Sequence, residues 1–155
     1  MPDVALTARA DLLRQIPVFA GLSEAALTVL AQAVDEVEYD AGEIVVREGE
    51  PGNRMFIILS GSVEVVKYLG EPRETALDVM RAKNFLGEMS IVDSVVRSAS
   101  VRALEKSRLF TLKGIDLYHL FKRFPEQYAI VILNIARDLA RRLRALDEKF
   151  SATSH

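Results

Sequence analysis

The hydrophobic pattern of this chain changes its period twice, and this limits the folds that the chain can adopt. From Glu43 to Leu112 the apolar residues form short runs, rich in β-branched and aromatic side chains, between glycine and proline turns. Before and after this stretch they recur every three or four positions, which is the period of a helix. Short strands at this spacing are typical of a sandwich or barrel, here with helices on both sides.

The central stretch is expected to hold at least six strands. Glycine and proline residues at 49–53, 60–61 and 70–72 favour tight turns between neighbouring strands. The expected strands are residues 44–46, 55–59, 63–68, 75–80, 100–104 and 108–112.

The flanking segments are expected to be helical. Pro17 separates two apolar segments near the N-terminus, and Ser23 is a suitable N-cap for the second. After Gly114 a short helical segment precedes a longer one, which begins near Pro125 and runs to about Phe150. The longer segment carries one apolar stripe, as an amphipathic helix does, formed by Tyr128, Ile132, Ile135, Leu139, Leu143, Leu146 and Phe150.

Composition favours one soluble domain over residues 1–155, with helices in 1–40, a β unit in 41–113 and helices in 114–150. The formal net charge of -2 and pI of 5.8 argue against binding nucleic acid through bulk charge. Residues 1–10 lack the features of a secretory signal, and no apolar run approaches the roughly 20 residues that span a bilayer. The chain has no cysteine, which is compatible with a reducing compartment. We therefore expect a cytoplasmic protein with no membrane segment.

The residues best suited to bind a ligand lie in the segment 84–101. Gly87 follows a strand-like segment and precedes an apolar turn, so a ligand can approach the backbone, and the free amides of a helical turn there suit a phosphate. Arg97, ten residues later, is a permanent cation whose planar fork can bind two phosphate oxygens. Because a carboxylate only accepts hydrogen bonds, Glu88 is better suited to a ribose hydroxyl. Ser98 can add a hydroxyl donor.

Three blocks of the sequence resemble the cyclic nucleotide-binding domain family. They are residues 16–23, 42–65 and 87–101, in this order, and the resemblance as a whole extends over nearly the whole chain. The resemblance implies an α+β, mainly β fold, in which a β-roll of the double-stranded β-helix or jelly-roll type is flanked by N-terminal helices and a long C-terminal helix. Residues 84–101 then resemble the phosphate-binding cassette of the family.

The resemblance also implies roles for single residues. Arg97 would pair with the cyclic phosphate, Glu88 would accept from the ribose, and backbone amides with the Ser98 hydroxyl would complete the cradle. Serine at position 98 leans toward cyclic AMP, because family members that prefer cyclic GMP often have threonine there. The expected ligand-binding residues are Gly87, Glu88, Met89, Arg97, Ser98 and Ala99.

Two positions depart from the family pattern and motivate alternative hypotheses. Residues 93–96 lack the glycine and proline that many members have before the arginine, and Lys83 stands where glycine is common. A second hypothesis is therefore a degenerate member that binds no nucleotide and acts as a dimerisation or docking scaffold. A third is a roll that binds a cyclic dinucleotide, as some activator relatives do.

The C-terminal helix has several interpretations. In the leading hypothesis it moves over the base when nucleotide binds, which would be the output of the module. Its stripe would pack on the β unit, or its distal half would pair with a second copy to form a homodimer. The cluster of Arg137, Arg141, Arg142 and Arg144 is either a solvated face or includes a base-stacking guanidinium, for which Arg141 and Arg142 are the candidates.

The sequence favours a regulatory module over an enzyme. His119 lies in an apolar segment and His155 is terminal, so no histidine cluster is available for a metal site of the cupin type or for nucleophilic catalysis. No catalytic residue, metal or cofactor is expected beyond the nucleotide ligand. In transcription factors of the family a helix-turn-helix follows the long helix, but this sequence ends about five residues after Phe150. We expect no direct DNA recognition, so the response passes to an unidentified effector protein or an oligomeric partner.

Overall fold

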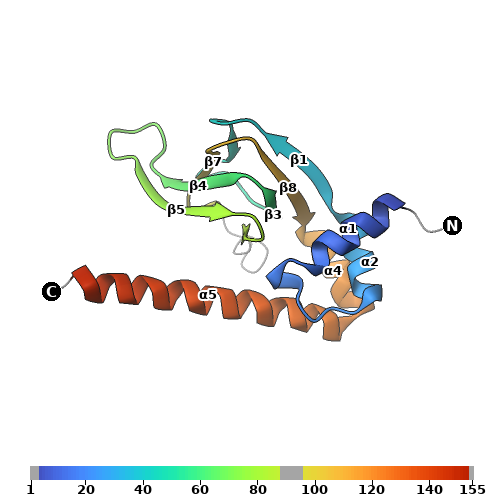
Figure 1. Cartoon of the computed structure of the whole chain (residues 1–155). Helices are drawn as coiled ribbons and strands as arrows, with labels where there is room; N and C mark the ends of the chain where they lie inside the picture. The colour runs from blue at the N-terminus through green and yellow to red at the C-terminus, as the bar shows by residue number, and fades with distance from the viewer. Residues whose placement is uncertain (1–3, 88–95, 154–155) are drawn as a thin grey trace.

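The computed structural model of the chain describes residues 4–87 and 96–153 (Figure 1). Helices lie at both ends of the described chain: α1 Val4–Arg14, the 3-10 helix η1 Pro17–Phe19, α2 Glu24–Ala33, α4 Gly114–Arg123 and α5 Pro125–Thr153. The strands between them are β1 Asp35–Tyr39, β2 Ile44–Val46, β3 Arg54–Ser60, β4 Ser62–Lys67, β5 Thr75–Arg81, β6 Phe85–Leu86, β7 Ser100–Ala103 and β8 Ser107–Lys113.

The eight strands form two antiparallel sheets of four, with orders β1-β8-β3-β6 and β2-β7-β4-β5. The chain passes between the sheets after β1, β2, β3, β5, β6 and β7, which is the connectivity of a β-roll. The expectation of a mainly β roll flanked by helices, with a long C-terminal helix, is confirmed.

One expected boundary differs from the structure. Residues 35–39 fall within the expected N-terminal helical segment, but they form β1, which pairs with β8 along its length. Charged residues at 35, 36 and 38 hide the strand pattern, because β1 is an edge strand with one face open to solvent. The expected N-cap at Ser23 is confirmed, since its Oγ accepts from the Ala26 amide at 3.2 Å.

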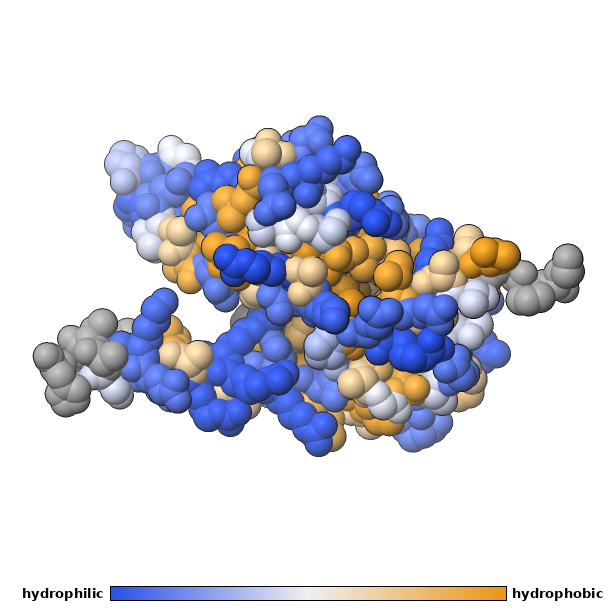
Figure 2. All heavy atoms as spheres, viewed as in Figure 1, coloured by the Kyte–Doolittle hydropathy of each residue, from blue (hydrophilic) through white to orange (hydrophobic). Residues whose placement is uncertain are grey.

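Two hydrophobic clusters hold the molecule together, and apolar residues gather where the roll meets the helices (Figure 2). The larger cluster joins α1, η1, α2, α4 and the start of α5 to one face of the β3–β8 sheet. The smaller cluster lies inside the roll, between the two sheets, and consists of Phe56, Ile58, Val63, Met80, Leu86, Val101 and Leu109. We call this smaller group the roll cluster.

The two halves of α5 have different surroundings. In the proximal half Val131 and Ile135 are buried in the larger cluster. The distal half extends past the helical end of the molecule and runs alongside the roll (Figure 1). Its leucines Leu143 and Leu146 are 60% and 51% exposed. Across the described residues, none of the helices combines the length and the apolar character that crossing a membrane requires.

Candidate functional site

Gly87 lies at the point where β6 ends and the expected cassette begins. Strand β6 pairs with β3 through Phe85 and Leu86, so the position of Gly87 is fixed by the sheet. Its φ of +86° is in the left-handed region that favours glycine. A Cβ at this position would lie 2.7 Å from both the Arg54 carbonyl oxygen and the Arg97 Nη1 atom. Glycine is therefore required here, because the guanidinium of Arg97 lies directly against the backbone.

Arg97 is held in this place by several hydrogen bonds. Its Nη2 donates to the Arg54 carbonyl at 2.9 Å. Its backbone amide donates to the Glu50 carbonyl at 2.8 Å, and its carbonyl accepts from the Gly49 amide at 2.8 Å. The side chain is only 9% exposed, although a guanidinium is always charged. The fold thus places the nearly buried guanidinium of Arg97 against the backbone of Gly87, where a side chain at position 87 would collide with it.

Three residues outside the expected cassette hold its second half in place near Ser98. Lys67 Nζ donates to the Ser98 carbonyl at 2.7 Å and pairs with the Glu48 carboxylate at 3.2 Å. The other carboxylate oxygen of Glu48 accepts from the Tyr68 amide at 3.1 Å. We call Glu48, Lys67 and Tyr68 the Ser98 clamp. Its members lie at the ends of two strands, and sequence reasoning missed it.

The Ser98 clamp also changes the acidity of Glu48. The hydrogen bond from the Tyr68 amide lowers the pKa of the Glu48 carboxyl, and the Lys67 ammonium lowers it further. The Glu48 amide in turn donates to the Ser100 hydroxyl at 2.9 Å, which joins the clamp to the start of β7. No signal in the sequence marks the clamp, since Tyr68 reaches its position through an unusual backbone with φ of 59°.

The other expected ligand-binding residues are placed as follows. The side chain of Ser98 is exposed and Ala99 is half-buried, on the short segment between Arg97 and β7. Glu88 and Met89 lie outside the described residues. The structure therefore brings Gly87 and Arg97 together. The roles of Glu88, Met89, Ser98 and Ala99 stay predictions.

The two arginine candidates on α5 have different positions. Arg142 Nη2 donates to the Phe85 carbonyl at 3.0 Å, and its guanidinium lies 5.0 Å from the centre of the Phe85 ring. Its Nε also pairs with Asp138 at 2.6 Å. Arg141 is 60% exposed and lies 3.6 Å from Asp138. Only Arg142 of these two therefore contacts the strand that leads into Gly87.

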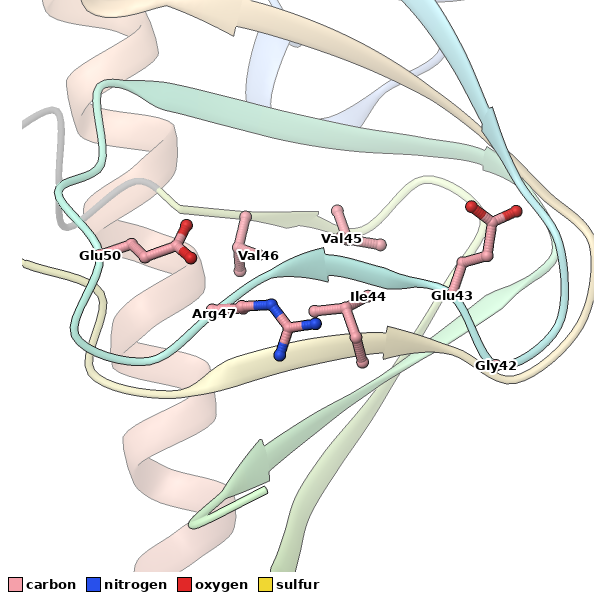
Figure 3. A pocket seen from close by; sticks show the side chains of 7 residues that line it. All are labelled: Gly42, Glu43, Ile44, Val45, Val46, Arg47 and Glu50. Carbon is pink, nitrogen blue, oxygen red and sulfur yellow. The ribbon is translucent and has the colours of Figure 1, made fainter. Parts of the chain in front are cut away.

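A separate hollow of about 400 Å³ lies along β2. Gly42 and Glu43 stand at one end of this strand, and Arg47 and Glu50 at the other (Figure 3). The backbone links the hollow to the site, because the Glu50 carbonyl accepts the hydrogen bond from the Arg97 amide. Arg97 itself does not line it. We therefore locate the candidate site at Gly87 and Arg97, where a buried cation is present.

Metal chemistry was not expected, and the described part of the chain contains no group of three or more histidine, cysteine, aspartate or glutamate residues that would hold an ion. His119 packs beside Tyr118, with ring centres 6.3 Å apart. Arg97, with its neighbouring amides, is instead suited to an anion such as a phosphate.

Comparison with known proteins gives the site its context. The profile of the cyclic nucleotide-binding domain matches residues 36–124. The chain is 31% identical over 134 residues to a CRP-like cAMP-activated global transcriptional regulator of Mycobacterium tuberculosis, covering 86% of this chain and 58% of that protein. It is 32% identical over 94 residues to a cGMP-dependent protein kinase of Caenorhabditis elegans, covering 60% of this chain and 12% of the kinase. This chain thus spans a little over half of the regulator and a small part of the kinase.

Solved structures agree with the sequence matches. The catabolite activator protein of Thermus thermophilus superposes on this chain with a TM-score of 0.72 and 31% identity, covering 89% of this chain and 63% of that one. The matched profile begins in β1 and ends just after α4, so it includes the whole roll and the site at Gly87 and Arg97. The chain belongs to the cyclic nucleotide-binding domain family.

Proposed function

We propose that this regulatory module binds a cyclic nucleotide, with cyclic AMP preferred over cyclic GMP, through the site at Gly87 and Arg97. The observation that carries the proposal is the nearly buried Arg97 guanidinium held against the side-chain-free backbone of Gly87. A cyclic phosphate would accept from this fork and from neighbouring amides. The names of the relatives include both cAMP and cGMP proteins, so the preference rests on Ser98.

The roll cluster supports a nucleotide over a bare anion. Leu86 directly precedes Gly87, and the Phe56 ring lies 5.8 Å from the Arg97 guanidinium carbon. Met80 and Val101 belong to the same cluster, between the two sheets. A planar base or a ribose ring next to the phosphate would bury apolar surface against this cluster.

Isothermal titration with cyclic AMP, cyclic GMP and a cyclic dinucleotide tests the proposal. We expect the protein to bind cyclic AMP most tightly, and Arg97→Ala to abolish binding. Arg81→Ala removes an exposed arginine on β5 and is the matched control, which should bind normally. Silence with all three ligands would favour the non-binding scaffold, and heat only with the dinucleotide would favour the third hypothesis.

We propose further that nucleotide binding moves the distal half of α5. Arg142 contacts the Phe85 carbonyl and ring, one strand residue before Leu86 and two before Gly87, so a ligand at Gly87 would alter the surroundings of Arg142. The proximal half is fixed in the larger cluster through Val131 and Ile135. A shift of population between two positions of the distal half would carry the signal.

Because the chain has no cysteine, two introduced cysteines can report this movement by spin-label distances. The pair Leu77→Cys and Leu146→Cys joins exposed positions on β5 and distal α5. The control pair Leu77→Cys and Leu133→Cys joins β5 to an exposed position on proximal α5. Cyclic AMP should change the first distance distribution and leave the second unchanged; identical behaviour of both pairs would contradict the proposal.

Distal α5 also suits pairing with a second copy, since Leu139, Leu143 and Leu146 are 38%, 60% and 51% exposed. We propose that these leucines form the contact of a homodimer. Sedimentation velocity should show a dimer that Leu143→Glu converts to a monomer. Leu133→Glu, which changes an exposed leucine of the proximal half, should stay dimeric.

A further inference from the structure

A groove lies between α5 and the segment around η1. None of the functions proposed above involves this groove. Its volume is about 480 Å³. Pro17 and Ala20 line one side, and Asn134 and Ala140 lie on the helix side. The groove also contains the side chains of Arg137, Arg141 and Arg144. Spacings of four and three residues place the three arginines on one face of the helix, over roughly 10 Å of its length.

The charge of this groove is largely uncompensated. In the described part of the chain, Arg137 and Arg144 have no hydrogen-bond or ion-pair partner. Arg141 lies 3.6 Å from Asp138, but Asp138 forms its closer pair with Arg142 at 2.6 Å. Three cations thus gather on one helix face of a protein whose net charge is -2. Hydrophilic residues line this distal part of α5 (Figure 2).

The groove is built by specific contacts. Asn134 Nδ2 donates to the carbonyls of Val18 and Ala20, each at 3.0 Å, and so fixes the η1 segment against α5. These bonds hold Pro17 and Ala20 in position opposite the arginines. The groove therefore exists before a ligand arrives, which lowers the entropic cost of binding.

We propose that the groove binds an acidic segment of a partner protein, with carboxylates on the three arginines and an apolar side chain against Pro17, Ala20 and Ala140. Arginine forks bind carboxylates in bidentate fashion, and the apolar floor suits a protein side chain. A nucleic acid would place most of its phosphates beyond this short stripe and would leave the apolar floor of Pro17, Ala20 and Ala140 without an apolar side chain. The inference does not require nucleotide binding.

The probe for this proposal is a fluorescein-labelled peptide of six glutamates around one leucine, followed by fluorescence anisotropy at low salt without nucleotide. We expect binding that weakens with added salt and at least about tenfold in the double variant Arg137→Gln, Arg144→Gln. The control Arg81→Gln, Lys106→Gln removes the same charge from two exposed positions elsewhere and should bind the peptide as the unchanged protein does.

The outcomes separate this inference from the proposed function. Absence of peptide binding, or equal weakening of binding in both double variants, would contradict the proposal that the groove binds an acidic segment. Tighter binding of single-stranded DNA or phosphatidylserine vesicles through the same two arginines would replace the protein partner. Cyclic AMP titration of the groove variant should give normal heat, so failure of one proposal leaves the other standing.

Discussion

The two sides of the candidate site are held in different ways. On the roll side, Arg97 is fixed through its guanidinium, its amide and its carbonyl, and Ser98 is fixed by Lys67. On the helix side, Arg142 reaches the roll through the carbonyl and ring of Phe85. The roll side is a cradle fixed by several hydrogen bonds, whereas the helix side is joined by a side chain that is 31% exposed. We therefore expect the roll side to bind the ligand and the helix side to respond to it.

The largest effect is expected from Gly87→Ala on the roll side. The new Cβ would lie 2.7 Å from both the Arg54 carbonyl and Arg97 Nη1, in a backbone with φ of +86°. Either the backbone or the guanidinium must move, at a cost of about 1–3 kcal/mol. We expect loss of cyclic AMP binding in calorimetry and a lower midpoint of urea unfolding.

Gly70→Ala is the matched control for backbone strain. Gly70 has a φ of +81°, but a Cβ there would meet nothing within 4 Å. This variant should lose about 1 kcal/mol of stability and keep its affinity for cyclic AMP. Equal loss of binding in both variants would show that strain alone, and not contact with Arg97, explains the effect at Gly87.

The Ser98 clamp should produce the next largest effect. Lys67→Met keeps most of the side-chain length but removes the donor to the Ser98 carbonyl and the partner of Glu48. Because Lys67 is 33% exposed, we assign this hydrogen bond the typical contribution of about 1 kcal/mol, so affinity for cyclic AMP should fall roughly fivefold. Lys106→Met, at an exposed position in the turn before β8, should bind as the unchanged protein does. Unchanged affinity in Lys67→Met would show that the Ser98 clamp does not contribute to nucleotide binding.

Local sequence patterns predicted the roll, the long helix and the proximity of Gly87 to Arg97. Turns, hydrophobic periodicity and motif spacing depend on residues that lie close together in the sequence. The Ser98 clamp could not be predicted, since it joins Glu48, Lys67 and Ser98 across strands. Lys83 shows how a departure from the family pattern is resolved. It adopts the left-handed conformation, with φ of 76°, at the position where glycine is common. Its amide still donates to the Ile58 carbonyl at 2.8 Å, so the turn before the cassette is kept.

The helix side should give a smaller effect than either change on the roll side. Arg142→Gln removes the cation beside Phe85, and a cation–π contact at a partly exposed site contributes about 0.5–1 kcal/mol. Affinity for cyclic AMP should fall roughly threefold, and the free energy of unfolding should fall by about 0.5–1 kcal/mol, because the contact is already present without nucleotide. Arg141→Gln is the control and should change neither quantity, because Arg141 points into the groove with Pro17 and Ala20. A larger loss of affinity in Arg141→Gln than in Arg142→Gln would show that Arg141, and not Arg142, acts on the site.

The smallest expected effect is a pH dependence of the roll side that Glu48 introduces. The amide of Tyr68 and the ammonium of Lys67 lower the pKa of Glu48 below its ordinary value of 4.5. A carboxyl with a lowered pKa in the folded state adds stability above its unfolded pKa, and this stability is lost as the pH falls through the folded pKa. Glu48→Gln should therefore lose less stability than the unchanged protein between pH 5 and pH 3. Urea unfolding at both pH values measures the difference, and Glu50→Gln, an exposed neighbour, is the control. A parallel loss in all three proteins would mean that the clamp does not hold the Glu48 carboxylate, and the cradle would then be fixed by the hydrogen bonds of Arg97 alone.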